Sequence, residues 1–135
     1  MIRVLIVDGQ AQVRSGLRMR LTIEPDMAVI GETGDAAEAL ALAQILTPDV
    51  IVVDIGMRGA QGVDVVKRLR AVASDARVLV LTLQSDEDTR ARAREAGAQA
   101  FLEKHSGAAD LLQTIRRLAS QPTPGPLAAR RLGVG

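Results

Sequence analysis

The chain has 135 residues, a formal net charge of +1 and no cysteine. This length predicts one domain with a substantial core, and the missing cysteines exclude disulfide scaffolds, cysteine zinc sites and thiol catalysis. The apolar runs are too short to span a membrane and the N-terminus lacks the layout of a signal peptide, so we expect a cytoplasmic protein without a membrane partner. The balanced charge and the single aromatic residue, Phe101, argue against direct nucleic-acid binding.

Five short runs rich in β-branched residues predict strands. In chain order they are residues 4–7, 27–32, 50–54, 78–82 and 100–103. The first, third and fourth runs are continuous in Val, Ile and Leu, which is typical of strands buried on both faces of a parallel sheet.

Segments of helical length separate these runs. The expected helices cover residues 11–23, 35–46, 63–72, 85–96 and 108–119. Asp35 with Glu38 predicts a capping box at the start of the second helix, and Ser85 is the expected N-cap of the fourth. Gly97 suits the position after the fourth helix, where the backbone often turns left-handed.

The strict alternation of strands and helices indicates an α/β fold with an open parallel sheet and helices on both faces. This pattern covers residues 1–119. Residues 120–135 begin with three prolines within five residues and have no apolar period, so we expect a proline-rich linker or tail there.

Polar side chains stand where several of the expected strands end. Asp8 and Asp54 end the first and third runs, Thr82 ends the fourth, and Lys104 follows the fifth. Ligands of open α/β sheets bind outside the carboxyl ends of the strands, and buried carboxylates there need a cation. Carboxylates suit Mg²⁺, while a hydroxyl and an ammonium suit phosphoryl oxygens. The pattern therefore predicts Mg²⁺-assisted phosphoryl transfer with Asp54 as the nucleophile.

Segments 2–8, 48–54, 78–82 and 97–104, which carry these residues, resemble the response-regulator receiver domains of bacterial two-component signalling. The resemblance extends from residue 2 to about residue 119 and is strongest to the NarL/FixJ class. It implies a flavodoxin-like (CheY-like), doubly wound sheet of five parallel strands in the order 2-1-3-4-5, with five helices.

The resemblance also implies a role for each matching residue. Asp54 matches the phosphoacceptor, and Asp8 matches an acidic residue of the metal site. Mg²⁺ would bind Asp8, Asp54 and the backbone carbonyl of Gly56, while Thr82 and Lys104 would contact the phosphoryl group. These residues are therefore the candidate catalytic and metal-binding set.

Thr82 and Phe101 match the two switch positions of the family. In the family they reshape the face formed by the fourth helix, the fifth strand and the fifth helix. The implied partners are a sensor histidine kinase and a second copy of the chain, bound through this face or a neighbouring one. The NarL/FixJ likeness further implies control of transcription through a DNA-binding domain in the parent protein.

The sequence departs from the family pattern in its acidic pocket. Gly9 stands where receivers carry a second acid, so the chain offers fewer ligand charges and we expect weak Mg²⁺ binding. Arg58 places a cation beside the site, and the bulk of Leu83 is expected to narrow access for the phosphodonor.

Two functions therefore remain open. One is a receiver phosphorylated on Asp54, and the other is a pseudo-receiver that works as an interaction module without phosphorylation. A nucleotide or flavin enzyme is disfavoured. The chain has neither a Gly-x-x-x-x-Gly-Lys loop nor a Gly-x-Gly-x-x-Gly loop after its first strand, and it has no aromatic residue to cover a flavin.

Overall fold

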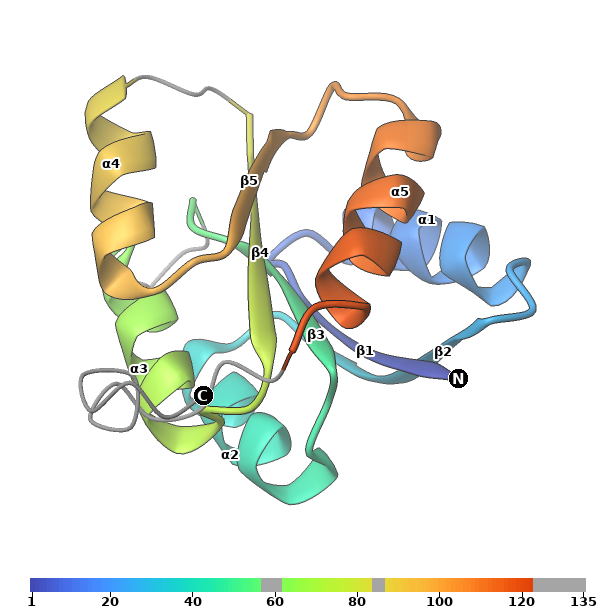
Figure 1. The fold of residues 1–135 in the computed structure, drawn as a ribbon, viewed down its shortest axis with the longest axis horizontal. Helices are drawn as coiled ribbons and strands as arrows, with labels where there is room; N and C mark the ends of the chain where they lie inside the picture. Colours follow the sequence, from blue (N-terminus) through green and yellow to red (C-terminus); the bar gives the residue numbers. More distant parts are fainter. Residues whose placement is uncertain (57–61, 84–86, 123–135) are drawn as a thin grey trace.

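The computed structural model describes residues 1–56, 62–83 and 87–122. Within them, strands and helices alternate along the chain (Figure 1). The strands are β1 (Ile2–Val7), β2 (Met27–Thr33), β3 (Val50–Asp54), β4 (Arg77–Thr82) and β5 (Ala100–Glu103). The helices are α1 (Ala11–Thr22), α2 (Ala36–Leu46), α3 (Asp64–Val72), α4 (Glu87–Ala96) and α5 (Ala108–Ala119).

The strands form one parallel sheet in the order β2-β1-β3-β4-β5, which confirms the predicted fold. Helices α1 and α5 cover one face, and α2, α3 and α4 cover the other (Figure 1). Because all strands run the same way, their carboxyl ends meet at one edge of the sheet.

The three central strands, β1, β3 and β4, supply most of the core. Alternate side chains of a strand point to opposite faces, so Leu5 packs toward α2 and α3 whereas Ile6 packs toward α1 and α5. Both side chains are fully buried, as are most residues of β3 and β4. The continuous apolar runs therefore reflect burial on both faces, as the sequence predicts.

The helix ends lie within two residues of the prediction, and α3 begins at Asp64 rather than at residue 63. Helix α1 ends at Thr22, one residue earlier than expected. The Glu38 backbone N–H donates to the Asp35 carboxylate at 2.8 Å, but the reciprocal half of the capping box is wrong, because the Asp35 N–H donates to the Thr33 hydroxyl. The predicted cap Ser85 lies outside the described residues.

Gly97 follows α4 with a φ of +115°, as predicted for a helix-ending glycine. Only residues 120–122 of the predicted linker are described. The Arg77 guanidinium donates to the Gln121 carbonyl and so holds the exit of α5 against the start of β4. Among the described residues, no helix has the length and apolar character needed to cross a membrane.

Candidate functional site

The carboxyl edge of the sheet brings three of the predicted residues into contact. Lys104 Nζ lies 2.8 Å from Asp8 Oδ2 and 3.1 Å from Asp54 Oδ2. The three side chains are between 1% and 10% exposed. Because β1 and β3 are neighbours, two carboxylates face each other across the edge and a single ammonium from the β5 end bridges them.

Backbone amides hold the other oxygen of each carboxylate. The Gln10 N–H donates to Asp8 Oδ1 and the Gly56 N–H donates to Asp54 Oδ1, both at 2.9 Å. A Cβ atom on residue 56 would lie 3.3 Å from Asp54 Oδ1, so glycine leaves room for this turn. Each carboxylate is thus fixed by its own loop and turned toward Lys104.

The electrostatics of Lys104 reflect two opposing effects. Burial disfavours the charged ammonium, but hydrogen bonding and charge from Asp8 and Asp54 outweigh it, so the pKa of Lys104 is raised above its ordinary value. Lys104 is therefore a permanent cation at neutral pH. It offsets one of the two negative charges in the pocket.

The acidic pocket has an oxygen donor set of the kind that Mg²⁺ takes. Asp8 Oδ2 is buried and, apart from its ionic contact with Lys104, has no hydrogen-bond partner. Asp8 Oδ2 and Asp54 Oδ2 both contact Lys104 Nζ, and carboxylate oxygens are ligands that a hard cation takes. No group of three or more acidic, histidine or cysteine side chains suited to a metal occurs in the described part of the chain. With two carboxylates and a competing ammonium, the donor set fits weak binding.

The main chain of Asp8 is held as firmly as its side chain. Its N–H donates to the Thr33 carbonyl at 3.0 Å, and its carbonyl accepts from Arg14 Nη1 at 2.6 Å. The guanidinium occupies space beside Gly34, where a Cβ atom would lie 2.6 Å from Arg14 Nη1. Sequence reasoning missed both residues, since an arginine in a helix and a glycine in a loop carry no specific signal.

The two predicted switch residues lie on adjacent strands. Thr82 is buried at the end of β4, and its carbonyl accepts from the Lys104 N–H at 2.6 Å. Phe101 is partly buried in β5, outside the ion cluster, and packs against the side of the core that α4 covers. The Arg90 Cζ atom lies 4.9 Å from the centre of its ring, within the range of a cation–π contact.

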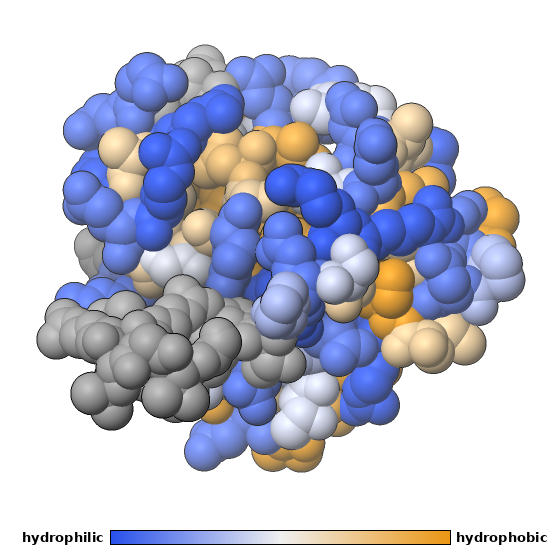
Figure 2. Space-filling view, viewed as in Figure 1, coloured by the Kyte–Doolittle hydropathy of each residue, from blue (hydrophilic) through white to orange (hydrophobic). Residues whose placement is uncertain are grey.

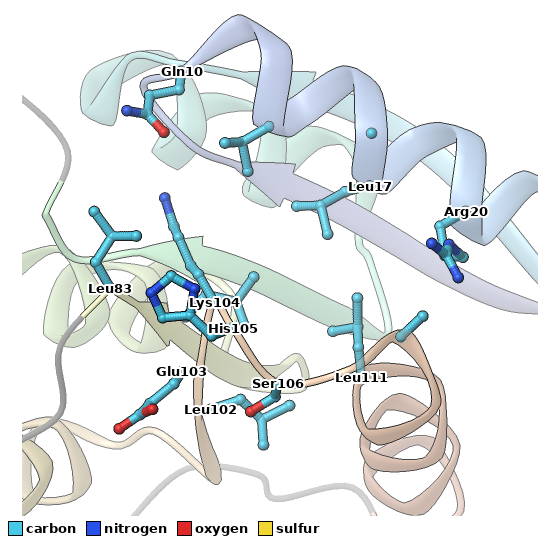
Figure 3. Close-up of a pocket in the computed structure, with 14 residues that line it drawn as sticks. Gln10, Leu17, Arg20, Leu83, Leu102, Glu103, Lys104, His105, Ser106 and Leu111 are labelled. Atoms are coloured by element: carbon cyan, nitrogen blue, oxygen red, sulfur yellow. The ribbon is translucent and has the colours of Figure 1, made fainter.

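A groove of about 440 Å³ opens beside the ion cluster, between α1 and the loop from β5 to α5 (Figure 3). Its lining is mainly apolar and includes Leu17, Leu102 and Leu111. Leu83 stands 55% exposed near the Lys104 end of the groove. In Figure 3 the Lys104 side chain extends toward Gln10 at the start of α1. Arg58 lies outside the described residues.

The ion cluster and the strand order correspond to a known family. The sequence model of the response regulator receiver domain family matches residues 4–116 of this chain. The chain belongs to the response regulator receiver domain family. Over 116 residues this receiver is 42% identical to the transcriptional regulatory protein LiaR of Bacillus subtilis, a match that covers 86% of the receiver chain and 55% of LiaR. The chain thus spans about half the length of the curated relatives it matches.

Solved structures agree with this assignment. The signal receiver domain of the response regulator NarL from Mycobacterium tuberculosis superimposes with a TM-score of 0.84 at 28% identity, covering 90% of this receiver and 98% of that domain. A response regulator from Burkholderia pseudomallei with a phosphorylated aspartic acid, a calcium ion and citrate gives a TM-score of 0.75 at 28% identity. That match covers 89% of this receiver and 69% of the Burkholderia chain.

Proposed function

We propose that this receiver accepts a phosphoryl group on Asp54 from a sensor histidine kinase and acts as the switch of a NarL-type transcriptional regulator. The carrying observation is the buried contact of Lys104 with both Asp8 and Asp54. Two buried carboxylates around one ammonium are costly for stability, so their presence favours a chemical role. The phosphorylated aspartic acid in the Burkholderia pseudomallei relative supports the same chemistry.

Asp54 would act as the nucleophile. One of its carboxylate oxygens forms a bond to phosphorus while the bond between phosphorus and the donor breaks, and the donor leaves with that electron pair. Lys104, next to Asp54 Oδ2, would move its ammonium onto the phosphoryl oxygens, and Thr82 would donate its hydroxyl to them. The Gly56 N–H keeps Asp54 oriented.

The metal of this proposal is Mg²⁺, held weakly by Asp8, Asp54 and the Gly56 carbonyl. When bound, it supplies positive charge for the phosphoryl oxygens. The calcium ion in the Burkholderia pseudomallei relative supports a divalent-cation site in the family. Asp8 contributes a carboxylate that its loop already points into the pocket.

The output would pass through Thr82 and Phe101 to the face made by α4, β5 and α5. Figure 2 supports the choice of this face as a binding surface, because hydrophobic residues gather over the sheet between the polar surfaces of α4 and α5. We propose that a second copy of the chain binds here or on a neighbouring face. The receiver domain would comprise residues 1–119 and residues 120–135 a linker or tail, in a cytoplasmic regulator whose further part binds DNA.

A second candidate function is a pseudo-receiver that signals without phosphorylation. Gly9, which replaces the second acid of the pocket, favours this alternative.

Titration with Mg²⁺, followed by NMR of the backbone amides, separates the two functions. A phosphorylatable receiver should show shifts at low millimolar Mg²⁺, confined to the residues around Asp54 and Asp8. The absence of shifts at tens of millimolar Mg²⁺ would support the pseudo-receiver.

Two variants sharpen this titration. Gly9→Asp should tighten Mg²⁺ binding about tenfold or more, because it adds a ligand charge. Gly9→Asn, which has nearly the same shape without the charge, is the matched control and should have a much smaller effect. Equal affinities for the two variants would show that the missing charge at position 9 is not what limits Mg²⁺ binding.

A further inference from the structure

Arg14 joins α1 to the point where β1 ends. Its Nη1 donates to the Asp8 carbonyl at 2.6 Å, across a turn that consists of Gly9 and Gln10. Gly9 is exposed and gives this turn more backbone freedom than any other residue would. The charged guanidinium therefore holds the Asp8 carbonyl directly before a glycine, where the intrinsic backbone restriction is lowest.

Gly34 makes this contact possible. A Cβ atom there would lie 2.6 Å from Arg14 Nη1 and 3.2 Å from the Asp8 carbonyl oxygen. Its φ is not in the left-handed region, so glycine is needed for space and not for backbone conformation. The β2–α2 loop thus leaves a slot for the guanidinium.

We infer that Arg14 is a positioning residue for the acidic pocket. By fixing the Asp8 backbone, it holds the Asp8 carboxylate toward Lys104 and Asp54 next to a glycine, whose backbone is intrinsically less restricted than that of other residues. This inference rests on the proposed function only in assigning Asp8 to the metal site. Arg14 itself touches neither the other two members of the ion cluster nor, in the proposal, the metal.

If Arg14 positions Asp8, Arg14→Gln and Gly34→Ala should both weaken Mg²⁺ binding. A simple effect of charge would not weaken binding in both variants. If Arg14 acted only as a nearby cation, Arg14→Gln would tighten Mg²⁺ binding by removing repulsion. If it positions Asp8, Arg14→Gln weakens Mg²⁺ binding about tenfold, as loss of a residue that orients a metal ligand typically does. Gly34→Ala keeps the charge but fills the slot, so it should weaken binding as well.

A readout without metal tests the positioning directly. The Gln10 amide donates to Asp8 Oδ1 and reports whether that carboxylate stays in place. We expect its solvent exchange, measured by NMR on the metal-free full chain, to become about fivefold faster in Arg14→Gln and in Gly34→Ala, the size expected for one weakened hydrogen bond. The double variant should be little worse than either single one, because both remove the same contact.

Arg18→Gln is the matched control. Arg18 lies one turn further along α1 and pairs with Glu32 at the surface, so its loss removes a charge from the same helix without touching Asp8. It should leave the Gln10 amide and the Mg²⁺ affinity unchanged.

Unchanged Gln10 exchange in Arg14→Gln, equal effects in Arg14→Gln and Arg18→Gln, or tighter Mg²⁺ binding in Arg14→Gln would each overturn the inference. The proposed function fails separately, if Asp54 accepts no phosphoryl group, and the Gln10 result would stand in that case. Conversely, normal Asp54 phosphorylation with unchanged Gln10 exchange would overturn only the role of Arg14.

Discussion

The described residues include two clusters in which one cation contacts two carboxylates, and their surroundings differ sharply. They are Lys104 with Asp8 and Asp54, and Arg116 with Glu24 and Asp26. In the first cluster no side chain is more than 10% exposed, whereas in the second the exposed fractions are 24% to 44%. The chemistry is alike, so burial is the variable that separates them.

Burial changes what each cluster contributes. The exposed cluster ties α5 to the loop between α1 and β2, and water solvates its members in both the folded and the unfolded state. In the buried cluster little of each side chain is open to solvent, so each ion depends on the others for compensation of its charge. A fold gains little stability from such a site, and its members are therefore the better candidates for function.

Removing the buried cation should have the largest effect. Lys104→Met leaves two carboxylates facing each other without a counter-ion, and we expect the free energy of unfolding to fall by about 3 kcal/mol. Urea denaturation with and without Mg²⁺ measures this change. Mg²⁺ should restore part of the loss by taking the place of the ammonium, and a variant as stable as the parent without Mg²⁺ would contradict the description of the cluster.

Removing one buried carboxylate should have a smaller effect. Asp8→Asn keeps an oxygen for the Gln10 N–H and leaves Lys104 paired with Asp54, so the free energy of unfolding should change by less than about 1 kcal/mol. The response to Mg²⁺ should nevertheless be lost. A large destabilisation with Mg²⁺ binding intact would reverse the assignment of Asp8 from ligand to structural residue.

The exposed cluster should tolerate the same kind of change. Arg116→Gln is expected to shift the urea midpoint far less than Lys104→Met, and the shift should shrink further at high salt, because salt screens exposed charges. Mg²⁺ should not alter it. If the two variants were equally destabilised, burial would not be the property that distinguishes the clusters.

The smallest predicted effect is a pH dependence in the exposed cluster. A hydrogen bond from Arg116 lowers the pKa of Asp26 below 3.8. A carboxyl with a lowered folded-state pKa adds stability above its unfolded pKa, and this stability is lost as the pH falls through the folded-state value. Arg116→Gln should therefore raise the pKa of Asp26 in an NMR titration. An unchanged pKa would mean that the Arg116 contact is not maintained in solution.

The sequence predicts the sheet because its signals are local and consistent. Continuous Val, Ile and Leu runs mark β1, β3 and β4, and parallel strands necessarily bring Asp8, Asp54 and Lys104 to one edge. The roles of Asp54, Thr82 and Phe101 in phosphorylation and switching stay predictions.

Contacts made by residues that carry no specific sequence signal could not be predicted from the sequence. Arg14 meets the Asp8 carbonyl only because Gly34, far along the chain, leaves space for it. The ring contact of Arg90 with Phe101 likewise depends on how α4 lies against β5. In each case the side chain has several possible partners, and tertiary packing selects one of them.

The most direct test of the proposed function is the intact mass of the chain after incubation with acetyl phosphate. With millimolar Mg²⁺, the parent chain should gain the mass of one phosphoryl group, and Asp54→Asn should gain none. Omitting Mg²⁺ should abolish or greatly slow the gain. A parent chain that remains unmodified under conditions that modify Gly9→Asp would contradict phosphorylation of Asp54 and leave the pseudo-receiver as the function of this domain.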